Sequence, residues 1–255
     1  MIFNLTKKVF CEESAKERLI MVDIAYKRIL LKLSGEVLSE KIDKQGEQSM
    51  MDFIAGEVSG VVRSHCQVGI VIGGGNIIRG AVSKHNRVIA DQVGMLATII
   101  NALLLKEAFQ SKGFDAVIMN AFEVGKIVGR FSQDKAIRKL EKGKVVIFSG
   151  GTGNPYFSTD TAAALRALEI GASALIKGSK VDGVYDKDPM KYPKAKKFDI
   201  LTYDEVIEKE LKVMDLTAFA LLKNSNIPVI VYKMSEPGML AKVLGNKGNM
   251  SIVKS

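Results

Sequence analysis

The order of apolar and polar residues predicts alternating strands and helices along most of the chain. In the first strand Ile29, Leu31 and Leu33 alternate with Arg28 and Lys32, which is the two-residue period of a strand. Short apolar runs of this kind predict strands over 26–33, 68–72, 116–119, 145–148, 174–177 and 229–232. Apolar residues at helical spacing, together with capping signals, predict helices over 48–64, 88–112, 158–170, 215–224 and 237–244, and one that opens at Thr202.

Strands that alternate with helices of ten or more residues predict βαβ units and a largely parallel central sheet. No proline-rich or low-complexity linker divides the chain. We therefore expect an α/β fold in which two lobes share one sheet. Ligands of such sheets bind beyond the carboxyl ends of the strands, so the loops at those ends are the candidates for function.

The composition narrows the class of protein. The chain has 255 residues, of which 47% are hydrophobic and 25% are charged, and these values exclude disordered, collagen-like and disulfide-scaffold proteins. Two cysteines, Cys11 and Cys66, are too few for a metal cluster or a disulfide framework and favour a reducing, cytoplasmic setting. No uninterrupted apolar run reaches the roughly 20 residues of a membrane span. The net charge of +9 favours anionic partners, from nucleic acids to small phosphates.

Residues 1–20 do not resemble a signal peptide, because Val9, Phe10 and Cys11 are followed directly by two glutamates. We expect the natural chain to start at Met21, since residues 16–17 can be encoded as a ribosome-binding sequence just upstream of it. A native N-terminal tail is the alternative. The folded part would then cover residues 21–255, with lobes over 21–172 and 173–255.

Four loops that follow predicted strands are rich in glycine. They cover residues 32–35, 73–76, 150–155 and 177–179. Glycine lets backbone N–H groups approach a phosphate closely and permits positive φ, and a following helix N-terminus adds partial positive charge. Each loop alone is well explained as a tight turn. Four together, with Lys32, Arg79 and Thr152 nearby, indicate a site for phosphate groups.

The common nucleotide-binding fingerprints are absent. No G-x-x-x-x-G-K-[ST] sequence occurs, and the glycines at 73–75 fail G-x-G-x-x-G because Ile78 takes the third glycine position. Neither histidine belongs to a catalytic dyad, so nucleophilic catalysis is disfavoured. Phosphoryl transfer fits better, because it depends on positioning and charge stabilisation.

Several stretches resemble those of bacterial-type UMP kinases, which belong to the amino acid kinase superfamily. The stretches are 27–36 (KRILLKLSGE), 71–76 (VIGGGN) with 79–80 (RG), 91–98 (DQVGMLAT), 151–160 (GTGNPYFSTD), 180–185 (KVDGVY) and 211–216 (LKVMDL). The stretch 151–160 is the most specific of them. The resemblance runs in order from about residue 25 to the end, and residues 1–20 lie outside it.

The resemblance implies a three-layer αβα sandwich with a mostly parallel central sheet. It implies the reaction of UMP with ATP to give UDP and ADP, with Mg²⁺ held through the ATP phosphates and no residue assigned as its direct ligand. It also implies a homohexamer, a UMP-binding lobe over 21–172 and an ATP-binding lobe over 173–255.

Site residues follow from the resemblance by motif position. Lys32 and Arg79 would neutralise charge on the transferring phosphoryl group, and Asp160 and Asp215 would orient Mg²⁺ or the phosphate-binding groups. Asp91 would accept hydrogen bonds from the UMP ribose. The ATP-binding set is Lys32, Leu33, Ser34, Gly35, Gly75, Arg79, Ser179, Tyr185 and Asp188. The UMP-binding set is Gly74, Asp91, Thr152, Gly153, Asn154, Pro155, Tyr156, Phe157, Ser158 and Thr159.

Physical reasoning supports Lys32 independently, because a charged residue inside an apolar strand needs a reason and cations stabilise phosphoryl transition states. An exposed strand face is the alternative. For Asp160 the alternative is a helix-start residue that interacts with the helix dipole.

Two departures from the family pattern bear on ligands. Ser179 stands where threonine is common, and it keeps the hydroxyl group, so ATP binding is expected to persist. Residues 40–45 (EKIDKQ) contain no glycine, whereas many relatives carry a glycine-rich segment there that is linked to GTP activation. GTP activation is therefore doubtful, and inhibition by UTP stays open.

Two rival functions remain open on the sequence alone. Another enzyme of the superfamily would phosphorylate a carboxylate, a carbamate or isopentenyl phosphate, but it should lack the stretch 151–160. A nucleic-acid-binding protein is suggested by basic residues that are interleaved with Tyr192 and Phe198, although a solvated loop explains such a run more simply. Those basic residues are Lys187, Lys191, Lys194, Lys196 and Lys197.

The long helix carries an apolar stripe. Val93, Leu96, Ile100, Leu103 and Leu104 recur at helical spacing. We expect this stripe to belong to the core, with its outward part packed between subunits.

Overall fold

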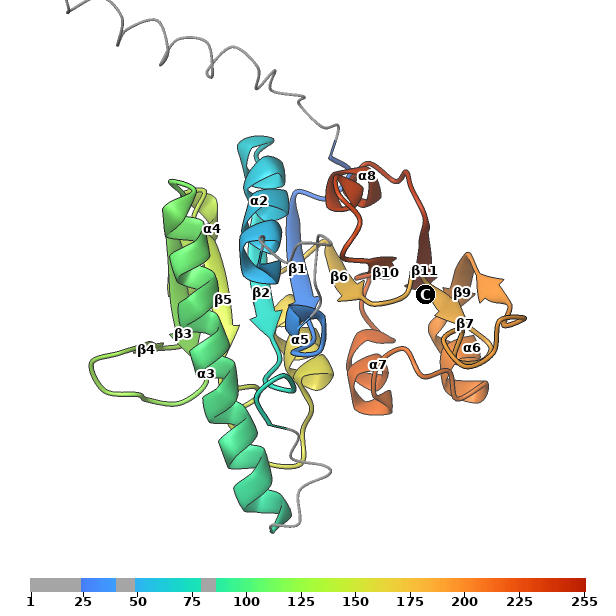
Figure 1. Ribbon diagram of the computed structural model, residues 1–255, viewed down its shortest axis with the longest axis horizontal. Coiled ribbons are helices and arrows are strands. Elements are labelled where there is room, and N and C mark those ends of the chain that lie inside the picture. Colours follow the sequence, from blue (N-terminus) through green and yellow to red (C-terminus); the bar gives the residue numbers. More distant parts are fainter. Residues whose placement is uncertain (1–23, 40–48, 79–85) are drawn as a thin grey trace, which may run out of the picture.

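Strand β1 (Arg28–Leu33) lies at the centre of one nine-stranded sheet. The computed structural model describes residues 24–39, 49–78 and 86–255, and its strands are ordered β4–β3–β5–β2–β1–β6–β10–β11–β9 (Figure 1). The other strands are β2 (Gln67–Ile72), β3 (Ala116–Asn120), β4 (Gly129–Arg130), β5 (Val145–Ser149), β6 (Ala174–Ser179), β9 (Ile200–Thr202), β10 (Val229–Lys233) and β11 (Met250–Lys254). A hairpin of β7 (Val184–Tyr185) and β8 (Lys197–Phe198) stands apart from this sheet.

The predicted parallel sheet is confirmed, with one exception at its C-terminal end. All pairs within the main sheet are parallel except β10 with β11, which are antiparallel. All six predicted strands are present. The sequence did not predict β4, β7, β8, β9 or β11, because strands of two or three residues carry too little periodicity and β11 has no long apolar run.

Helices join most of these strands. They are the 3₁₀ helix η1 (Val37–Ser39), α2 (Met50–Arg63), α3 (Arg87–Ser111), α4 (Gln133–Glu141), α5 (Thr159–Glu169), α6 (Tyr203–Glu208), α7 (Leu216–Leu222) and α8 (Met239–Leu244). The predicted capping box is confirmed, since Thr202 and Glu205 bond to each other's backbone at the start of α6. Helix α4 was not predicted, because most of its residues are polar and only Ala136 and Leu140 are buried.

The sheet separates two hydrophobic cores, as the alternation in β1 requires. Ile29, Leu31 and Leu33 face a core that is completed by α2, α3 and α8, and Leu30 faces a second core that is completed by α4 to α7. Figure 1 shows α2, α3 and α8 on the near side of the sheet. The three-layer αβα arrangement is therefore confirmed, and Lys32 lies on the face that α5 covers.

The prediction that the apolar stripe of α3 belongs to the core is wrong for the single chain. The exposed fraction of its residues ranges from 38% at Val93 to 52% at Leu96. The inner side of α3 carries small residues such as Ala97 and Ala102, which let the helix lie close to the sheet. Large apolar residues lie on both sides of α3, since Ile99, Leu105 and Phe109 are buried while Leu96, Ile100 and Leu104 are exposed. By length and composition α3 could cross a membrane, and it is the one such helix among the described residues, with 44% of its apolar window buried.

Candidate functional site

Two lysines lie next to each other on the central strands. The parallel pairing of β1 with β6 places Lys32 directly opposite Lys177, so both side chains leave the sheet on the same face. Both interrupt apolar strands, and Lys32 is only 4% exposed. Like charges on neighbouring strands repel each other, so this pair requires a nearby anion.

Asp160 supplies that anion from the first turn of α5, which packs on β1 and β6. Its Oδ1 is 2.5 Å from the Nζ of Lys32, and its Oδ2 is 3.3 Å from the Nζ of Lys177. Lys177 also donates a hydrogen bond to the carbonyl oxygen of Val213. In the Lys32–Asp160–Lys177 triad one carboxylate thus holds two ammonium groups through charge-assisted contacts.

Burial and charge shift the protonation of this triad. Burial alone would raise the pKa of Asp160, but Lys32 and Lys177 outweigh it and hold this pKa below its usual value. Burial, and then the charge of Lys32, lower the pKa of Lys177 from 10.5 to about 8, against the opposing effect of Asp160. At neutral pH Asp160 is therefore ionised and most Lys177 side chains are protonated.

Asp215 ties the start of α7 to the start of α5. Its carboxylate caps α7 by accepting a hydrogen bond from the backbone N–H of Ala218 at 2.7 Å. It also accepts the hydroxyl of Thr161 at 2.9 Å and the hydroxyl of Ser158, which is the N-cap of α5. Asp215 thereby fixes the turn that carries Asp160.

Lys177 is a residue of the candidate site that the sequence analysis did not assign. A signal was present, because Lys177 is a charged residue at the end of an apolar run just as Lys32 is. Only the strand register reveals that these two residues are neighbours.

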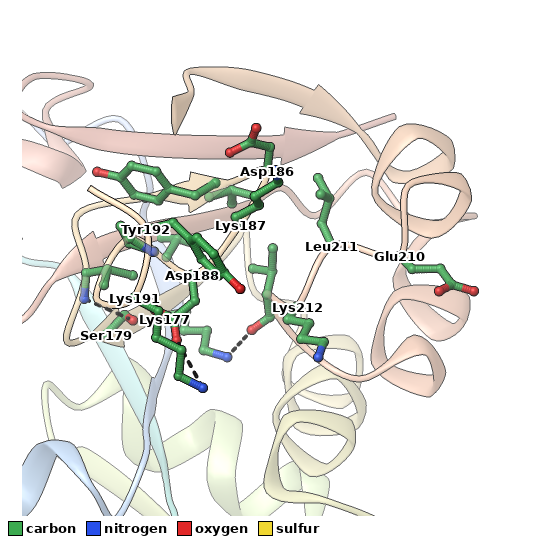
Figure 2. Close-up of a pocket in the computed structure, with 17 residues that line it drawn as sticks. Lys177, Ser179, Asp186, Lys187, Asp188, Lys191, Tyr192, Glu210, Leu211 and Lys212 are labelled. Carbon is green, nitrogen blue, oxygen red and sulfur yellow. Dashed lines mark hydrogen bonds and ion pairs between the residues drawn. The ribbon is translucent and has the colours of Figure 1, made fainter. Parts of the chain in front are cut away.

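A cavity of about 600 Å³ lies beside the triad and is lined by residues between 177 and 231. Of the predicted ATP-binding residues, Ser179, Tyr185 and Asp188 line it. Figure 2 shows the segment of Lys187 and Asp188 on one side of this cavity and that of Leu211 and Lys212 on the other. Its charged lining residues are Lys177, Lys187, Lys191, Lys212, Asp186, Asp188 and Glu210. The volume and the mixed lining suit a nucleotide-sized ligand.

Asp182 positions Tyr185 at this cavity. The hydroxyl of Tyr185 donates a hydrogen bond to Asp182 at 2.6 Å, and the side-chain amide of Asn249 donates to the same carboxylate at 2.5 Å. The contact with Asp182 raises the pKa of Tyr185 to about 12. Lys197 pairs with Asp182 at 3.4 Å.

The basic run at 187–197 is divided between two environments. Lys187 and Lys191 line the cavity, whereas Lys197 is paired with Asp182. This division favours a small anionic ligand over an extended nucleic-acid strand.

A second cavity of about 340 Å³ lies where the loop after β2, the start of α3 and the loop after β5 meet. The predicted residues that line it are Gly74, Gly75, Asp91, Thr152, Asn154, Phe157 and Thr159. The sequence analysis did not assign the other lining residues, which are Glu36, Ile78, Ala90, Gly94, Met95, Thr98 and Gly151. Most of these belong to the motifs that carried the resemblance, so the signal was present without a role attached.

Some predicted residues lie beside the cavities rather than in their described walls. The side chain of Leu33 is fully buried in the core, and its carbonyl accepts the N–H of Gly73 at 2.8 Å. Ser34 and Gly35 form the turn after β1, packed against the backbone of residues 75 and 76. Apart from Lys32, Asp160 and Asp215, whose contacts are described above, the other described residues of the predicted set outside the cavity walls are Gly153, Pro155, Tyr156 and Ser158.

Asp91 connects α3 to the loop after β5. Its Oδ2 accepts hydrogen bonds from the Nε of Arg87 at 2.7 Å and from the backbone N–H of Tyr156 at 2.8 Å. Tyr156 has a φ of 70°, which is a rare conformation for an aromatic residue, and Arg87 lies 5.7 Å from its ring centre. The ribose contact implied for Asp91 would add to these bonds.

Three predicted features lie outside the described residues. They are the expected chain start at Met21 after residues 1–20, Arg79, which was placed in the catalytic and ATP-binding sets, and the segment 40–45 that bears on GTP activation.

The donor set does not resemble a resident metal centre. Among the described residues, no three Asp, Glu, His or Cys side chains come together as a metal-binding group. Asp160 is already paired with two lysines. These residues fit an Mg²⁺ ion that is held chiefly by nucleotide phosphates.

The two cavities adjoin at the triad. Thr159 lines the smaller cavity, and the next residue, Asp160, contacts Lys177, which lines the larger one. A group transferred from an anionic ligand in one cavity to an anionic ligand in the other would pass beside the ammonium groups of Lys32 and Lys177, which Asp160 holds in place. Phosphoryl transfer requires such positioning and charge stabilisation.

Known proteins are similar to this chain in sequence and in fold. The model of the amino acid kinase family matches residues 27–233. The uridylate kinase of Wolinella succinogenes is 49% identical over 231 residues, which cover 89% of this chain and 96% of that protein. The uridylate kinase of Aliarcobacter butzleri is 49% identical over 233 residues, or 89% and 99% of the two chains.

Solved structures agree with these relatives. The UMP kinase from Bacillus anthracis matches with a TM-score of 0.82 at 33% identity, over 90% of this chain and 96% of that one. The UMP kinase from Ureaplasma parvum has the same TM-score at 36% identity, over 90% and 99%.

Proposed function

This chain belongs to the amino acid kinase family, and from that premise we propose that it transfers the γ-phosphoryl group of ATP to UMP, giving UDP and ADP. The observation that carries the proposal is the Lys32–Asp160–Lys177 triad between two adjoining cavities. Relatives that are 49% identical over 89% of this chain are uridylate kinases, which favours UMP over the carboxylate and carbamate acceptors of the superfamily.

The two lobes divide the substrates in this proposal. ATP would occupy the larger cavity, whose lining lies wholly within 173–255, and UMP the smaller one, whose lining lies within 21–172. The shared sheet joins the lobes where β1 pairs with β6.

The triad acts by charge rather than by proton transfer. An oxygen of the UMP phosphate attacks the γ-phosphorus while the bond to the ADP oxygen breaks. Lys32 and Lys177 stabilise the negative charge on the oxygens of the moving group. Asp160 holds both ammonium groups in place, and its lowered pKa makes it a poor base. The UMP phosphate is already anionic and needs no base.

Mg²⁺ is proposed as the cofactor that arrives with ATP and offsets the charge of its phosphates. Asp160 and Asp215 contribute indirectly, by fixing the lysines and the start of α5. Arg79, assigned from the sequence alone, would add a third cation.

For regulation we propose that UTP inhibits by competing for the UMP cavity, since it presents the same base and sugar. We do not expect GTP activation, because residues 40–45 lack glycine.

We also propose self-association through α3, with a homohexamer as the full assembly. Ile89, Val93, Leu96, Ile100 and Leu103 are all exposed on this helix, and their spacing of three and four residues forms a continuous apolar seam. Leu96→Glu would place a charge in this seam, so sedimentation should give a smaller particle than for the wild type.

The buried free thiol of Cys66 is consistent with the proposed cytoplasmic setting.

A coupled assay of ADP release tests the activity. It compares UMP, CMP, dUMP, TMP and GMP as acceptors, with and without Mg²⁺, and includes acetylglutamate and carbamate for the superfamily rival. We expect rapid, Mg²⁺-dependent turnover with UMP. Equal or faster turnover with a carboxylate or carbamate, or no turnover with UMP, would contradict the proposal.

A further inference from the structure

Helix α3 carries two buried polar residues on its inner side. Thr98 is 2% exposed and Asn101 is fully buried, and they lie about one helical turn apart on the same face. Nearly all other buried residues of this helix are apolar. A buried polar side chain costs free energy unless its hydrogen bonds are made, so the partners of these two residues identify their role.

Asn101 holds the glycine loop after β2. Its Nδ2 donates a hydrogen bond to the carbonyl of Gly73 at 2.7 Å and another to the Oδ1 of Asn76 at 2.8 Å. Its Oδ1 accepts the Nδ2 of Asn76 at 3.0 Å. The side-chain amide is thus bonded to both ends of the segment that contains Gly74 and Gly75.

Thr98 holds the glycine loop after β5. Its Oγ1 accepts a hydrogen bond from the backbone N–H of Gly150 at 2.7 Å and donates one to the carbonyl of Met95 at 2.7 Å. Gly150 has a φ of 76°, so this N–H lies at the bend from which the loop departs. The next residues, Gly151 and Thr152, line the smaller cavity.

The first loop also packs directly on the backbone of α3. A Cβ atom added to Gly74 would lie 2.7 Å from the carbonyl oxygen of Gly94 and 2.8 Å from the Cβ of Ala97. The loop after β1 is equally close, because a Cβ on Gly35 would lie 2.3 Å from the backbone N of Gly75. Close packing against α3, and of one glycine turn against the other, therefore fixes the positions of these turns.

We propose that Thr98 and Asn101 are positioning residues that set the two glycine loops independently, so that each controls a different kinetic parameter. The inference rests on the proposed function for the meaning of those parameters. Asn101 fixes the loop beside Gly35 and the end of β1, which carries Lys32, and so governs the alignment of the moving phosphoryl group. Both loops line the smaller cavity, but the loop after β5 supplies more of its wall, from Gly151 to Thr159. Thr98 fixes the start of that loop, and so governs UMP affinity.

The kinetic test uses conservative variants of the two residues. Thr98→Val removes the hydroxyl, and we expect the KM for UMP to rise about tenfold with kcat and the KM for ATP within about twofold. Thr98→Ser keeps the hydroxyl and should restore the KM for UMP. Asn101→Asp loses the donor to Gly73, and we expect kcat to fall about 10²-fold, since a small misplacement of reacting groups has effects of that size.

Leu105→Ala is the matched control, because Leu105 is buried on the same helix and contacts neither loop through a polar group. It should lower the unfolding temperature and leave both KM values and kcat within about twofold below that temperature. Should Thr98→Val fail to fold, Thr98→Ala provides the same comparison.

Amide hydrogen exchange gives a readout that does not depend on activity. The N–H of Gly150 should exchange at least about tenfold faster in Thr98→Val than in the wild type, while exchange in β3 stays unchanged. If the wild type does not phosphorylate UMP, the proposed function fails and this exchange still decides the role of Thr98.

Three results would overturn the inference. They are unchanged exchange at Gly150 in Thr98→Val, equal rises in both KM values in that variant, and effects of Leu105→Ala on catalysis that match those of Asn101→Asp.

Discussion

The two cavities are built by different means. The smaller one is shaped by backbone, with glycine turns that are bonded to α3, and its described lining includes two carboxylates, those of Glu36 and Asp91, but no lysine or arginine. The larger one is shaped by side chains, with four lysines and three carboxylates in its lining. The Lys32–Asp160–Lys177 triad lies between them.

This difference indicates that mutations in the two cavities should have effects of different size. Backbone turns that are fixed by buried hydrogen bonds define a shape and tolerate little change. Flexible, exposed lysines attract a polyanion but contribute little singly, because solvent screens them. The largest effects of mutation should therefore fall on the triad, then on the glycine-built cavity, and last on the lysine-lined rim.

Mutations in the triad should lower activity most strongly. Lys32→Ala and Lys177→Ala should each lower kcat at least about 10²-fold, which corresponds to about 2.7 kcal/mol of transition-state stabilisation. Arg79→Ala is expected to match them. Steady-state assays on variants with wild-type circular dichroism measure the loss. Wild-type turnover in Lys177→Ala would remove that residue from the mechanism.

The glycine-built cavity should respond next. Gly74→Ala adds a Cβ against Gly94 and Ala97, which must displace the loop, and we expect kcat/KM for UMP to fall about tenfold to 10²-fold. Gly60→Ala in α2 is the control, since nothing lies within 4 Å of its added Cβ. Equal kinetics for the two variants would show that the close packing at residue 74 has no bearing on the site.

The pH profile tests the charge of the triad. The pKa of Lys177 is lowered to about 8, so its ammonium group loses the proton as the pH rises through that value. Values of kcat/KM should therefore fall above about pH 8, by up to about tenfold per unit. Lys177→Arg keeps the charge and should remove this limb. A wild-type profile that is flat from pH 7 to 9.5 would contradict the assignment.

Unfolding of the protein would not explain the expected fall in kcat/KM above about pH 8. The unfolded chain keeps the proton on Lys177 up to a pKa of about 10.4, whereas the folded protein releases it near 8. Between these values the unfolded state binds more protons, so the contribution of Lys177 to stability rises with pH. Thermal melts at pH 8 and 9.5 check this sign.

The lysine-lined rim should respond least. Lys212→Ala should raise the KM for ATP by about threefold at low salt, and by less at 0.3 M salt, because an exposed charge is screened. Lys209→Ala is the control, since Lys209 lies outside the cavity and pairs with Glu205. A tenfold effect of Lys212→Ala on kcat would make this residue part of the transfer step.

The sequence predicted the repeating parts of the fold well. All six predicted strands and the main helices are present, because apolar periodicity and caps such as Ser158 and Thr202 act over a few residues. It failed for α4, which has nine residues and buries only Ala136 and Leu140, and for strands of two or three residues. It also placed the stripe of α3 in the core, since a buried apolar face and an exposed apolar face have the same sequence pattern.

The candidate site was predicted in part. Lys32, Asp160 and Asp215 were identified by their motifs, and the structure brings the first two into contact. Lys177 was missed, and Thr98 and Asn101 received no role, because their significance comes from partners that lie far away in the chain.

The sequence by itself determined where strands, helices and glycine turns form, because these depend on neighbouring residues. Tertiary structure alone decided that Lys32 and Lys177 stand opposite each other, that Asp160 lies between their charges, and that α3 turns its polar pair toward the glycine turns. The physical reason is that hydrogen bonds between strands, and the packing of helices on them, join segments whose distance along the chain carries no signal of contact.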